Sequence, residues 1–497
     1  MSIGSTRFEK RLFTGLVCLA TLAATPGSAQ TTAPSAKLQF LQTIPIPGWD
    51  TNAAGFDLFA FNPETRILYV ADRTNHGIDA IDTRTNSFVG SLTVPNNASP
   101  NGVLVVPELQ QMVVTDGGKN VLVYDLRLPG MGPDIYAVPG ITGGTDALDY
   151  DPLNRRVYVI NGNAPYMMTG IDLITKTVAS QLALPGSPEL MRFNPVDGLI
   201  YQVITDGDNK NAGAGVAVFD PVSNTLKPTF LTPDCVPHGI DIDPVSNTAI
   251  LGCGGAQAQV LMDLKTGAVL KSFPDVTGTD LLLYNPNNRR FYTASSSNKS
   301  TTTGCPADGP TNPNYPVLGV FDALSSSTGR LVGIACSGRG AHGLGIDPIQ
   351  NLIYVGATQY PADPADRSTG STGVLVYYDP APAAQNLTTN TRAMLTGLGG
   401  NGAGGMVNIR TIGRTLRLDA NLQSVSGQTA LINVTTTVGN EVIPCSIDYK
   451  SGNAVCNGTL VGDPMINGVA LLAIDGAPAA QGKISAMPGP VPPVPAR

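Results

Sequence analysis

The sequence predicts an all-β protein, with a seven-bladed β-propeller over residues 38–380 followed by a small β-sandwich of Ig-like character over residues 388–486. Three observations predict this class. A pattern of short apolar strands and turns recurs seven times, glycine (56) and proline (40) are abundant, and the apolar segments are short and rich in β-branched residues. Short strands that repeat every ~40–45 residues are typical of propeller blades, because each blade is one small sheet.

The first 29 residues have the pattern of an export signal. Arg7, Lys10 and Arg11 form a basic start, Leu12 to Ala24 is an apolar stretch, and Gly27-Ser28-Ala29 is a small-residue cleavage site. The apolar stretch is too short to span a bilayer stably. We therefore expect a secreted or periplasmic protein without a membrane span.

The repeats predict how the propeller closes. Six of them contain a fourth strand, whereas the seventh runs into Ala/Pro-rich sequence after Tyr378-Asp379-Pro380. A strand just after the signal, Leu38 to Ile46, resembles those fourth strands. We expect it to complete the last blade, which would close the ring and remove its free edges.

The third strand of every repeat ends in aspartate. A residue that is identical in all seven repeats indicates a local turn role, in which the carboxylate accepts hydrogen bonds from the backbone N–H groups that follow. The seven residues are Asp82, Asp125, Asp172, Asp220, Asp263, Asp322 and Asp379.

Three stretches of the repeat resemble the YVTN and NHL classes of propeller repeat. They are ILYVADRTNHGIDAID (67–82), PHGIDIDP (237–244) and AHGLGIDP (341–348), and the likeness extends over roughly residues 38–380. The resemblance implies the propeller architecture. It implies no activity, because propellers carry many unrelated functions.

Beyond residue 388 the repeat is lost. Segments such as Thr415 to Leu422 and Ala430 to Val438 alternate between polar and apolar residues or run apolar between Gly/Asn turns, which favours the small sandwich. The tail, residues 487–497, is proline-rich and is expected to be disordered.

Cysteine and charge content limit the partners. Cys18 lies in the signal, and the other six cysteines form the local couples Cys235/Cys253, Cys305/Cys336 and Cys445/Cys456. An even number in an exported chain indicates disulfides, although the sequence leaves other pairings open. Charged residues are 13% of the chain and the net charge is −7, so we expect no nucleic-acid partner, which would need a basic surface.

One position of the repeat, six residues before the turn proline, varies in type but is always polar. Its occupants lie at the start of each first strand, so a closed ring would gather them at one end of the central channel. Successive occupants are separated by 42 residues (His238 to Asp280) to 62 residues (Asp280 to His342). The seven occupants are Asp57, Asn101, Asp146, Glu189, His238, Asp280 and His342.

His238, Asp280 and His342 come from three successive blades and are the predicted metal ligands. Two imidazoles and a carboxylate suit Zn²⁺, Fe or Mn, whereas the oxygen donors at the other four positions would by themselves suit Ca²⁺. The identity of the divalent metal therefore stays open. The alternative is a ring of polar residues that only caps a water-filled channel.

Four more roles are assigned around this ring. Glu189 and Asp57 are candidate ligands or bases, and the turn after Asp72 brings Arg73 and His76 to the same face, where either would act on a ligand or as a general acid or base. The alternative for His76 is a solvated turn with positive φ.

The arrangement is similar in kind to metal-centred propeller hydrolases and lyases, namely the gluconolactonase and paraoxonase group and the peptidyl-amidoglycolate lyases. This resemblance implies a metal at the channel mouth. The chain lacks the Glu-Gly-Pro start of the gluconolactonases, because Glu189 is followed by Leu190, so the resemblance does not extend to their substrates.

We therefore expect an exported propeller that acts as a hydrolase or lyase on a small-molecule substrate, through a metal-bound water or through Lewis acidity. The alternative is a non-catalytic periplasmic or cell-surface protein that binds a ligand or another protein.

Overall fold

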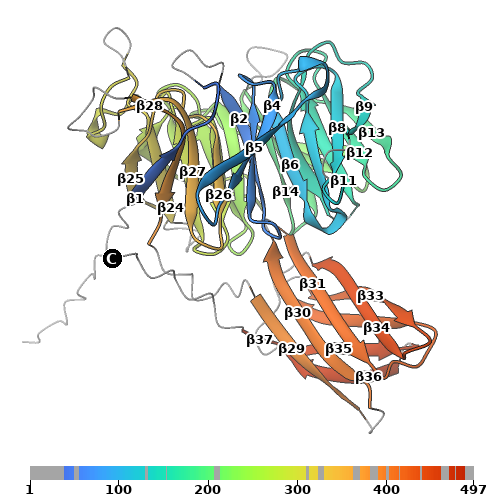
Figure 1. Cartoon of the computed structure of the whole chain (residues 1–497). Helices are drawn as coiled ribbons and strands as arrows, with labels where there is room; N and C mark the ends of the chain where they lie inside the picture. The colour runs from blue at the N-terminus through green and yellow to red at the C-terminus, as the bar shows by residue number, and fades with distance from the viewer. Residues whose placement is uncertain are drawn as a thin grey trace, which may run out of the picture. The chain divides into compact units, whose positions relative to one another are not determined.

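A computed structural model of the chain shows seven four-stranded antiparallel sheets and one closed sheet (Figure 1). It describes residues 38–486 apart from gaps at 50–54, 129–131, 153, 206–212, 309–312, 323–328, 362–369, 381–389, 399–401, 413–414, 437–438, 461–468 and 476. The predicted signal (1–29) and proline-rich tail (487–497) lie outside the described residues. In the described part of the chain, no helix has the length and apolar character that a membrane span needs.

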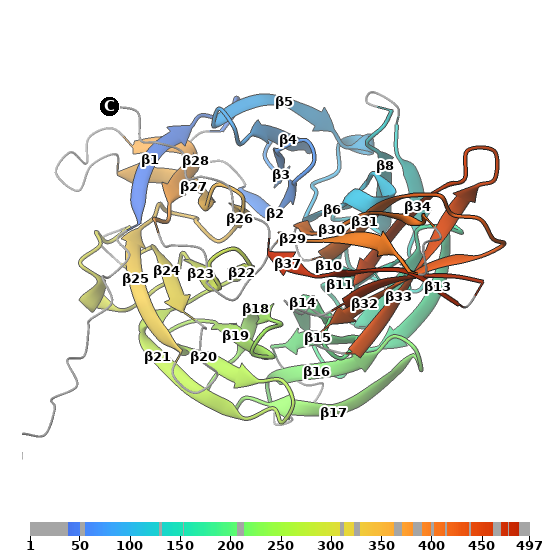
Figure 2. The ribbon, with the colours of Figure 1, turned by 90° about the horizontal axis from the view of Figure 1, so that it is seen from below.

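The seven sheets are the blades of a propeller, as predicted. The first strand of each blade contacts the first strands of both neighbouring blades, so these strands form a ring around a channel (Figure 2). From the inside outward the first six blades are β2–β5 (Phe56–Asn62, Ile67–Asp72, Gly77–Asp82, Ser87–Thr93), β6–β9 (Gly102–Val106, Gln111–Thr115, Asn120–Asp125, Asp134–Ala137), β10–β13 (Thr145–Asp151, Arg156–Asn161, Met167–Asp172, Thr177–Ala183), β14–β17 (Pro188–Asn194, Leu199–Ile204, Gly215–Asp220, Thr225–Leu231), β18–β21 (Pro237–Asp243, Thr248–Cys253, Ala258–Asp263, Val269–Thr277) and β22–β25 (Leu281–Asn285, Arg290–Ser295, Val317–Asp322, Arg330–Cys336).

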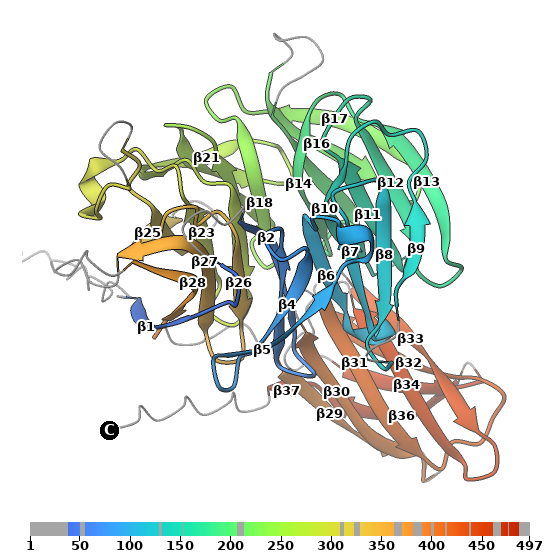
Figure 3. The same cartoon turned by 45° about the horizontal axis from the view of Figure 1, so that its top comes forward.

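The seventh blade is closed by the N-terminal strand, which confirms that prediction. It contains β26 (Leu344–Asp347), β27 (Leu352–Pro361) and β28 (Gly370–Tyr378), and β1 (Gln39–Ile44) pairs antiparallel with β28 from Gln39/Tyr378 to Ile44/Val374. Figure 3 shows β1 beside β28. One sheet thus joins both ends of the propeller segment, and β1 pairs with the outer edge of β28.

Burial follows the position of a strand within its blade. Inner and middle strands such as β15 and β19 are buried on both faces, because neighbouring blades pack against each side. Residues of outer strands such as β5 and β17 are half-buried or exposed. Three single-turn 3₁₀ helices, Pro95–Asn97, Pro107–Leu109 and Thr301–Thr303, lie between strands.

The aspartate at the end of each third strand forms the predicted turn in five blades. Asp82 and Asp125, for example, accept the backbone N–H two residues on, at 2.9 Å each. Asp379 has a role between blades that the repeat did not predict. It is fully buried and accepts hydrogen bonds from Tyr292 and from Arg290 (2.9 Å) of the neighbouring blade, so it holds blades six and seven together.

Three disulfides join the predicted couples: Cys235–Cys253, Cys305–Cys336 and Cys445–Cys456. The first joins Cys235, just before β18, to Cys253 of β19, and Cys445 and Cys456 face each other across the paired strands β33 and β34. Such bonds are compatible with an oxidising, extracellular compartment.

The C-terminal strands form a closed eight-stranded antiparallel barrel, and the predicted Ig-like sandwich is not confirmed. Strand β29 pairs with both β30 and β36, which joins the two ends of the sheet, and β37 (Ser485–Ala486) adds a short pairing to β29. A polar/apolar alternation marks one buried face in a barrel and in a sandwich alike, so the pattern did not distinguish them. Around the barrel the strands are β29 (Asn390–Gly397), β30 (Gly404–Ile412), β31 (Thr415–Gln423), β34 (Asn453–Leu460), β33 (Gly439–Asp448), β32 (Ala430–Thr436), β35 (Val469–Ile474) and β36 (Ala477–Lys483).

Candidate metal centre at the mouth of the propeller channel

The variable polar position of the repeat lies at one mouth of the channel. Asp57, Asp146, Glu189 and His238 are the second residues of β2, β10, β14 and β18, and the other three occupants lie one or two residues before their strands. A cavity of about 110 Å³ opens there and is called the cup below. Its lining residues are Asp57, Leu58, Arg73, Asp146, Ala147, Glu189, Leu190, Asp280, Leu281 and His342.

Adjacent residues line the cup in pairs, for example Asp57 with Leu58 and Glu189 with Leu190. In a regular strand consecutive side chains point to opposite faces. Four inner strands have an irregular register at this position, as between Phe56 and Phe59 or between Pro188 and Met191, and such bulges redirect side chains. These irregularities explain how two adjacent residues of one strand, one polar and one apolar, both line the cup.

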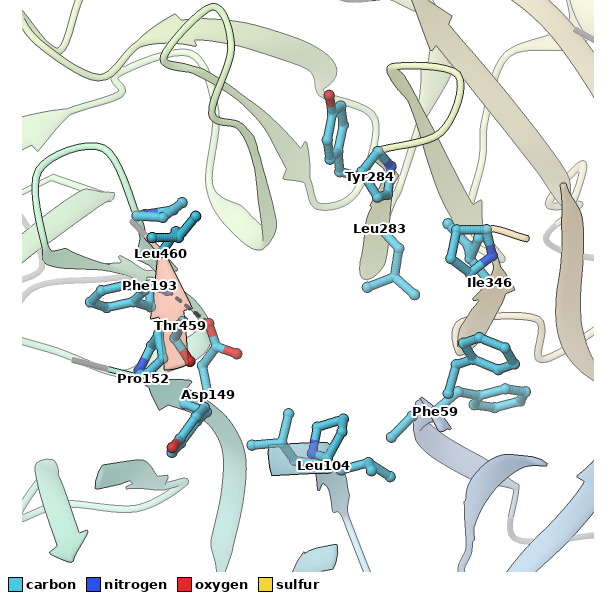
Figure 4. A pocket seen from close by; sticks show the side chains of 18 residues that line it. Phe59, Leu104, Asp149, Pro152, Phe193, Leu283, Tyr284, Ile346, Thr459 and Leu460 are labelled. Carbon is cyan, nitrogen blue, oxygen red and sulfur yellow. Dashed lines mark hydrogen bonds between the residues drawn. The ribbon is translucent and has the colours of Figure 1, made fainter. Parts of the chain in front are cut away.

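Figure 4 shows a different environment at the proline end of the first strands. The propeller side chains there are mainly apolar and include Phe59, Leu104, Phe193, Leu283 and Ile346. Asp149 also lies there, but it accepts the backbone N–H of Phe193 at 2.7 Å. The carboxylates of the variable position thus lie at the opposite end of these strands, in the cup.

Three donor side chains converge at the edge of the cup: Glu189 and Asp280 line it, and His238 lies beside them. One ligand atom from each of Glu189, His238 and Asp280 lies within 4.8 Å of the others. Nδ1 of His238 lies 3.8 Å from Oε1 of Glu189. The ring of His238 lies over Gly254, where an added Cβ would be 2.6 Å from Nε2.

The prediction of the ligand set agrees with this group at two of its three residues. His238 and Asp280 come together, and Glu189, which was assigned as a base or ligand, is their neighbour. His342 lines the same cup, but its ring stacks on Phe56 with 5.8 Å between centroids, and its Nδ1 lies 3.0 Å from the carbonyl of Gly340. The aromatic neighbour from the adjoining blade was not readable from the repeat.

Burial and like charge raise the pKa values of the carboxyl groups. Burial, followed by the charges of Asp280 and Asp146, raises the pKa of Glu189 to about 8. Burial also raises the pKa of Asp57 and of Asp146, while the positive charge of Arg73 acts in the opposite direction on both. Carboxyl groups that are costly to ionise unaided gain most from a bound cation.

The two remaining predicted residues separate in the structure. Arg73 reaches the cup, where it pairs with Asp57 and donates from Nε to Oδ1 of Asn101 at 3.0 Å. His76 has φ 52°, as its turn reading predicted, and its Nδ1 lies 3.2 Å from Oγ of Ser99. His76 is not among the residues that line the cup.

Comparisons with known proteins identify no family. No model of a protein family matches the chain, and no curated protein matches it significantly. One solved structure with a similar chain is entitled "Crystal Structure of Mitotic Checkpoint Complex", with 14% identity, a TM-score of 0.49, and coverage of 74% of this chain and 100% of that chain. A similarity of this size identifies no function, and the propeller assignment follows from this chain's own strand pairing.

Proposed function

We propose that one divalent metal ion binds at the edge of the cup through Glu189, His238 and Asp280, and that the protein is a metal-dependent hydrolase or lyase. The observation that supports this proposal is the convergence of three donor groups from three successive blades within 4.8 Å. An imidazole with two carboxylates suits Zn²⁺, Mn²⁺ or Fe²⁺ better than an all-oxygen set would. When bound, such an ion supplies Lewis acidity and lowers the pKa of a coordinated water.

The surroundings of the donors favour this role. Four apolar residues, Leu58, Ala147, Leu190 and Leu281, line the cup beside its polar residues. A volume of about 110 Å³ holds an ion with a few waters or with the reacting group of a substrate, but not a large substrate. The rest of a substrate would therefore lie outside the cup, on the loops of this face.

His342 and Asp146 line the cup but are not among the three proposed ligands, so we assign them roles toward a substrate. His342 lines the cup without belonging to the three-donor group, and we assign it the role of a general acid or base toward the substrate. Asp146 lines the same cavity, and burial raises its pKa while the charge of Arg73 opposes the shift. We also propose that the protein is secreted or periplasmic, which its three disulfides support.

Elemental analysis and calorimetric titration with Zn²⁺ and Mn²⁺ test the proposal. We expect one ion per chain in the wild type and its loss in Glu189→Gln, His238→Ala and Asp280→Asn. His76→Ala is the matched control, because it removes an imidazole from the same face outside the cup, and it should bind metal as the wild type does. A wild type that binds neither ion would refute the metal centre. Metal binding without hydrolysis of small esters, lactones or amides would favour the non-catalytic binding protein.

A further inference from the structure

The charges around the cup are distributed unevenly. Arg73 pairs with Asp57 on one side, and its charge acts on the pKa of Asp57 and of Asp146. On the other side the pKa of Glu189 is set by burial and by two carboxylates. The guanidinium therefore acts mainly on the Asp57 and Asp146 side of the ring.

Arg73 is held in this place by its own turn. Its backbone N–H donates to the carbonyl of Gly55 at 3.1 Å. The preceding Asp72 is fully buried and accepts from Nε1 of Trp49 (2.7 Å) and from the backbone N–H of Thr74 (2.8 Å). A turn tied on both sides fixes where the guanidinium lies, so its position does not depend on a ligand.

The guanidinium also bridges two blades. One nitrogen pairs with Asp57 of the first blade, and Nε donates to Oδ1 of Asn101 before the second blade. The amide of Asn101 in turn donates to the carbonyl of Thr145 at 3.1 Å, next to Asp146. Asp57, Asn101 and Asp146 offer only oxygen donors, which is the set that Ca²⁺ prefers.

We propose that Arg73 is a built-in cation that occupies the Asp57–Asn101 side of the cup, prevents a second metal ion from binding there, and so restricts the protein to the single ion at Glu189, His238 and Asp280. The inference builds on the proposed function, because it assigns how the same cup selects the number and type of its ions. Arginine suits this role because it stays charged at every accessible pH and binds carboxylate and amide oxygens through several donors. A divalent ion beside it would meet electrostatic repulsion from the guanidinium.

Replacement of Arg73 tests the inference. Arg73→Met keeps a long apolar stem but removes the charge, and Arg73→Lys keeps the charge as the matched control. By calorimetry, Arg73→Met should bind Ca²⁺ at least about tenfold more tightly than the wild type, whereas Arg73→Lys should not. Adding Asp57→Asn to Arg73→Met should abolish the gain. Circular dichroism and unfolding measurements check that the propeller of Arg73→Met is intact. Arg73→Gln serves as a second neutral replacement.

The outcomes separate this inference from the proposed function. Binding of Zn²⁺ with no gain of Ca²⁺ binding in either neutral variant overturns the role of Arg73 and leaves the metal centre standing. No Zn²⁺ binding by the wild type, together with Ca²⁺ binding by Arg73→Met, refutes the metal centre and supports the role of Arg73. Asp57→Asn alone gives an independent measurement, because it removes the carboxylate that pairs with Arg73 and leaves the guanidinium charge less neutralised, which should weaken Zn²⁺ binding by about tenfold. Unchanged Zn²⁺ affinity in that variant also counts against the inference.

Discussion

Replacement of Asp79 by asparagine should make the propeller less sensitive to rising pH. Asp79 lies in β4, is fully buried, and accepts a hydrogen bond from Oγ of Ser91. Within the described residues, its Oδ2 has no hydrogen-bond partner. Burial, with the charge of nearby Asp72 as the next cause, raises the pKa of Asp79 from 3.8 to about 8.

The sign follows from the raised pKa. The folded chain holds the proton up to about pH 8, whereas the unfolded chain loses it near pH 4, so the contribution of Asp79 to stability is complete at low pH and is lost as the pH rises between these values. One pH unit within this window costs about 1.4 kcal/mol, so the interval from about pH 5 to about pH 7.5 costs ~3 kcal/mol. Asparagine resembles the neutral carboxyl and removes this cost.

The assay is urea unfolding followed by tryptophan fluorescence. Trp49 is the only tryptophan of the chain, stacks on Phe56 at 4.4 Å, and donates to Asp72, so its emission reports on the first blade. The free energy of unfolding of Asp79→Asn, relative to the wild type, should increase by ~3 kcal/mol across the interval. Asp82→Asn is the control on the same strand. The Arg84 side chain lowers the pKa of Asp82, so this carboxylate is ionised in both the folded and the unfolded chain throughout the pH interval. A constant difference between Asp79→Asn and the wild type would refute a protonated Asp79.

Three further predictions concern the cup and the blades. Metal affinity should rise with pH and level off near pH 8, because Glu189 must lose a proton from a group whose pKa burial raises to about 8. Calorimetry at several pH values should show this rise in the wild type and in the His76→Ala control. Gly254→Ala should weaken metal binding by about tenfold or more with little change in circular dichroism, because the new Cβ would lie 2.6 Å from Nε2 of His238 and displace the ring. Unchanged metal affinity in this variant would exclude His238 as a ligand. Asp241→Ala should destabilise the propeller by ~3–5 kcal/mol in chemical unfolding, because Arg192, which is 4% exposed, loses its carboxylate partner at 3.2 Å. An equal loss of stability in the double variant Arg192→Met/Asp241→Leu would show that the unpaired charge is not the cause.

The blades and their closure were readable from the sequence because they depend on local patterns. The repeated strands, the turn aspartates such as Asp82, and the unmatched strand after the signal each carry their information within a few residues. The sequence suggested the local cysteine couples for the same reason but left other pairings open, and the structure decided among them, as for Cys445 and Cys456 across one hairpin. The closed barrel was not, because closure depends on β29 pairing with β36, more than 80 residues further along the chain.

The cup shows the same division. The sequence by itself determined that seven polar residues, His238 and Asp280 among them, lie at one end of a channel, because a closed ring of equivalent strands places equivalent positions together. Only the tertiary structure decided which of them meet. Local bulges turn Glu189 toward His238, Phe56 of the adjoining blade holds the ring of His342, and Arg73 neutralises one side. Such choices depend on distances of a few ångströms between separate blades, and a repeat pattern carries no information on that scale.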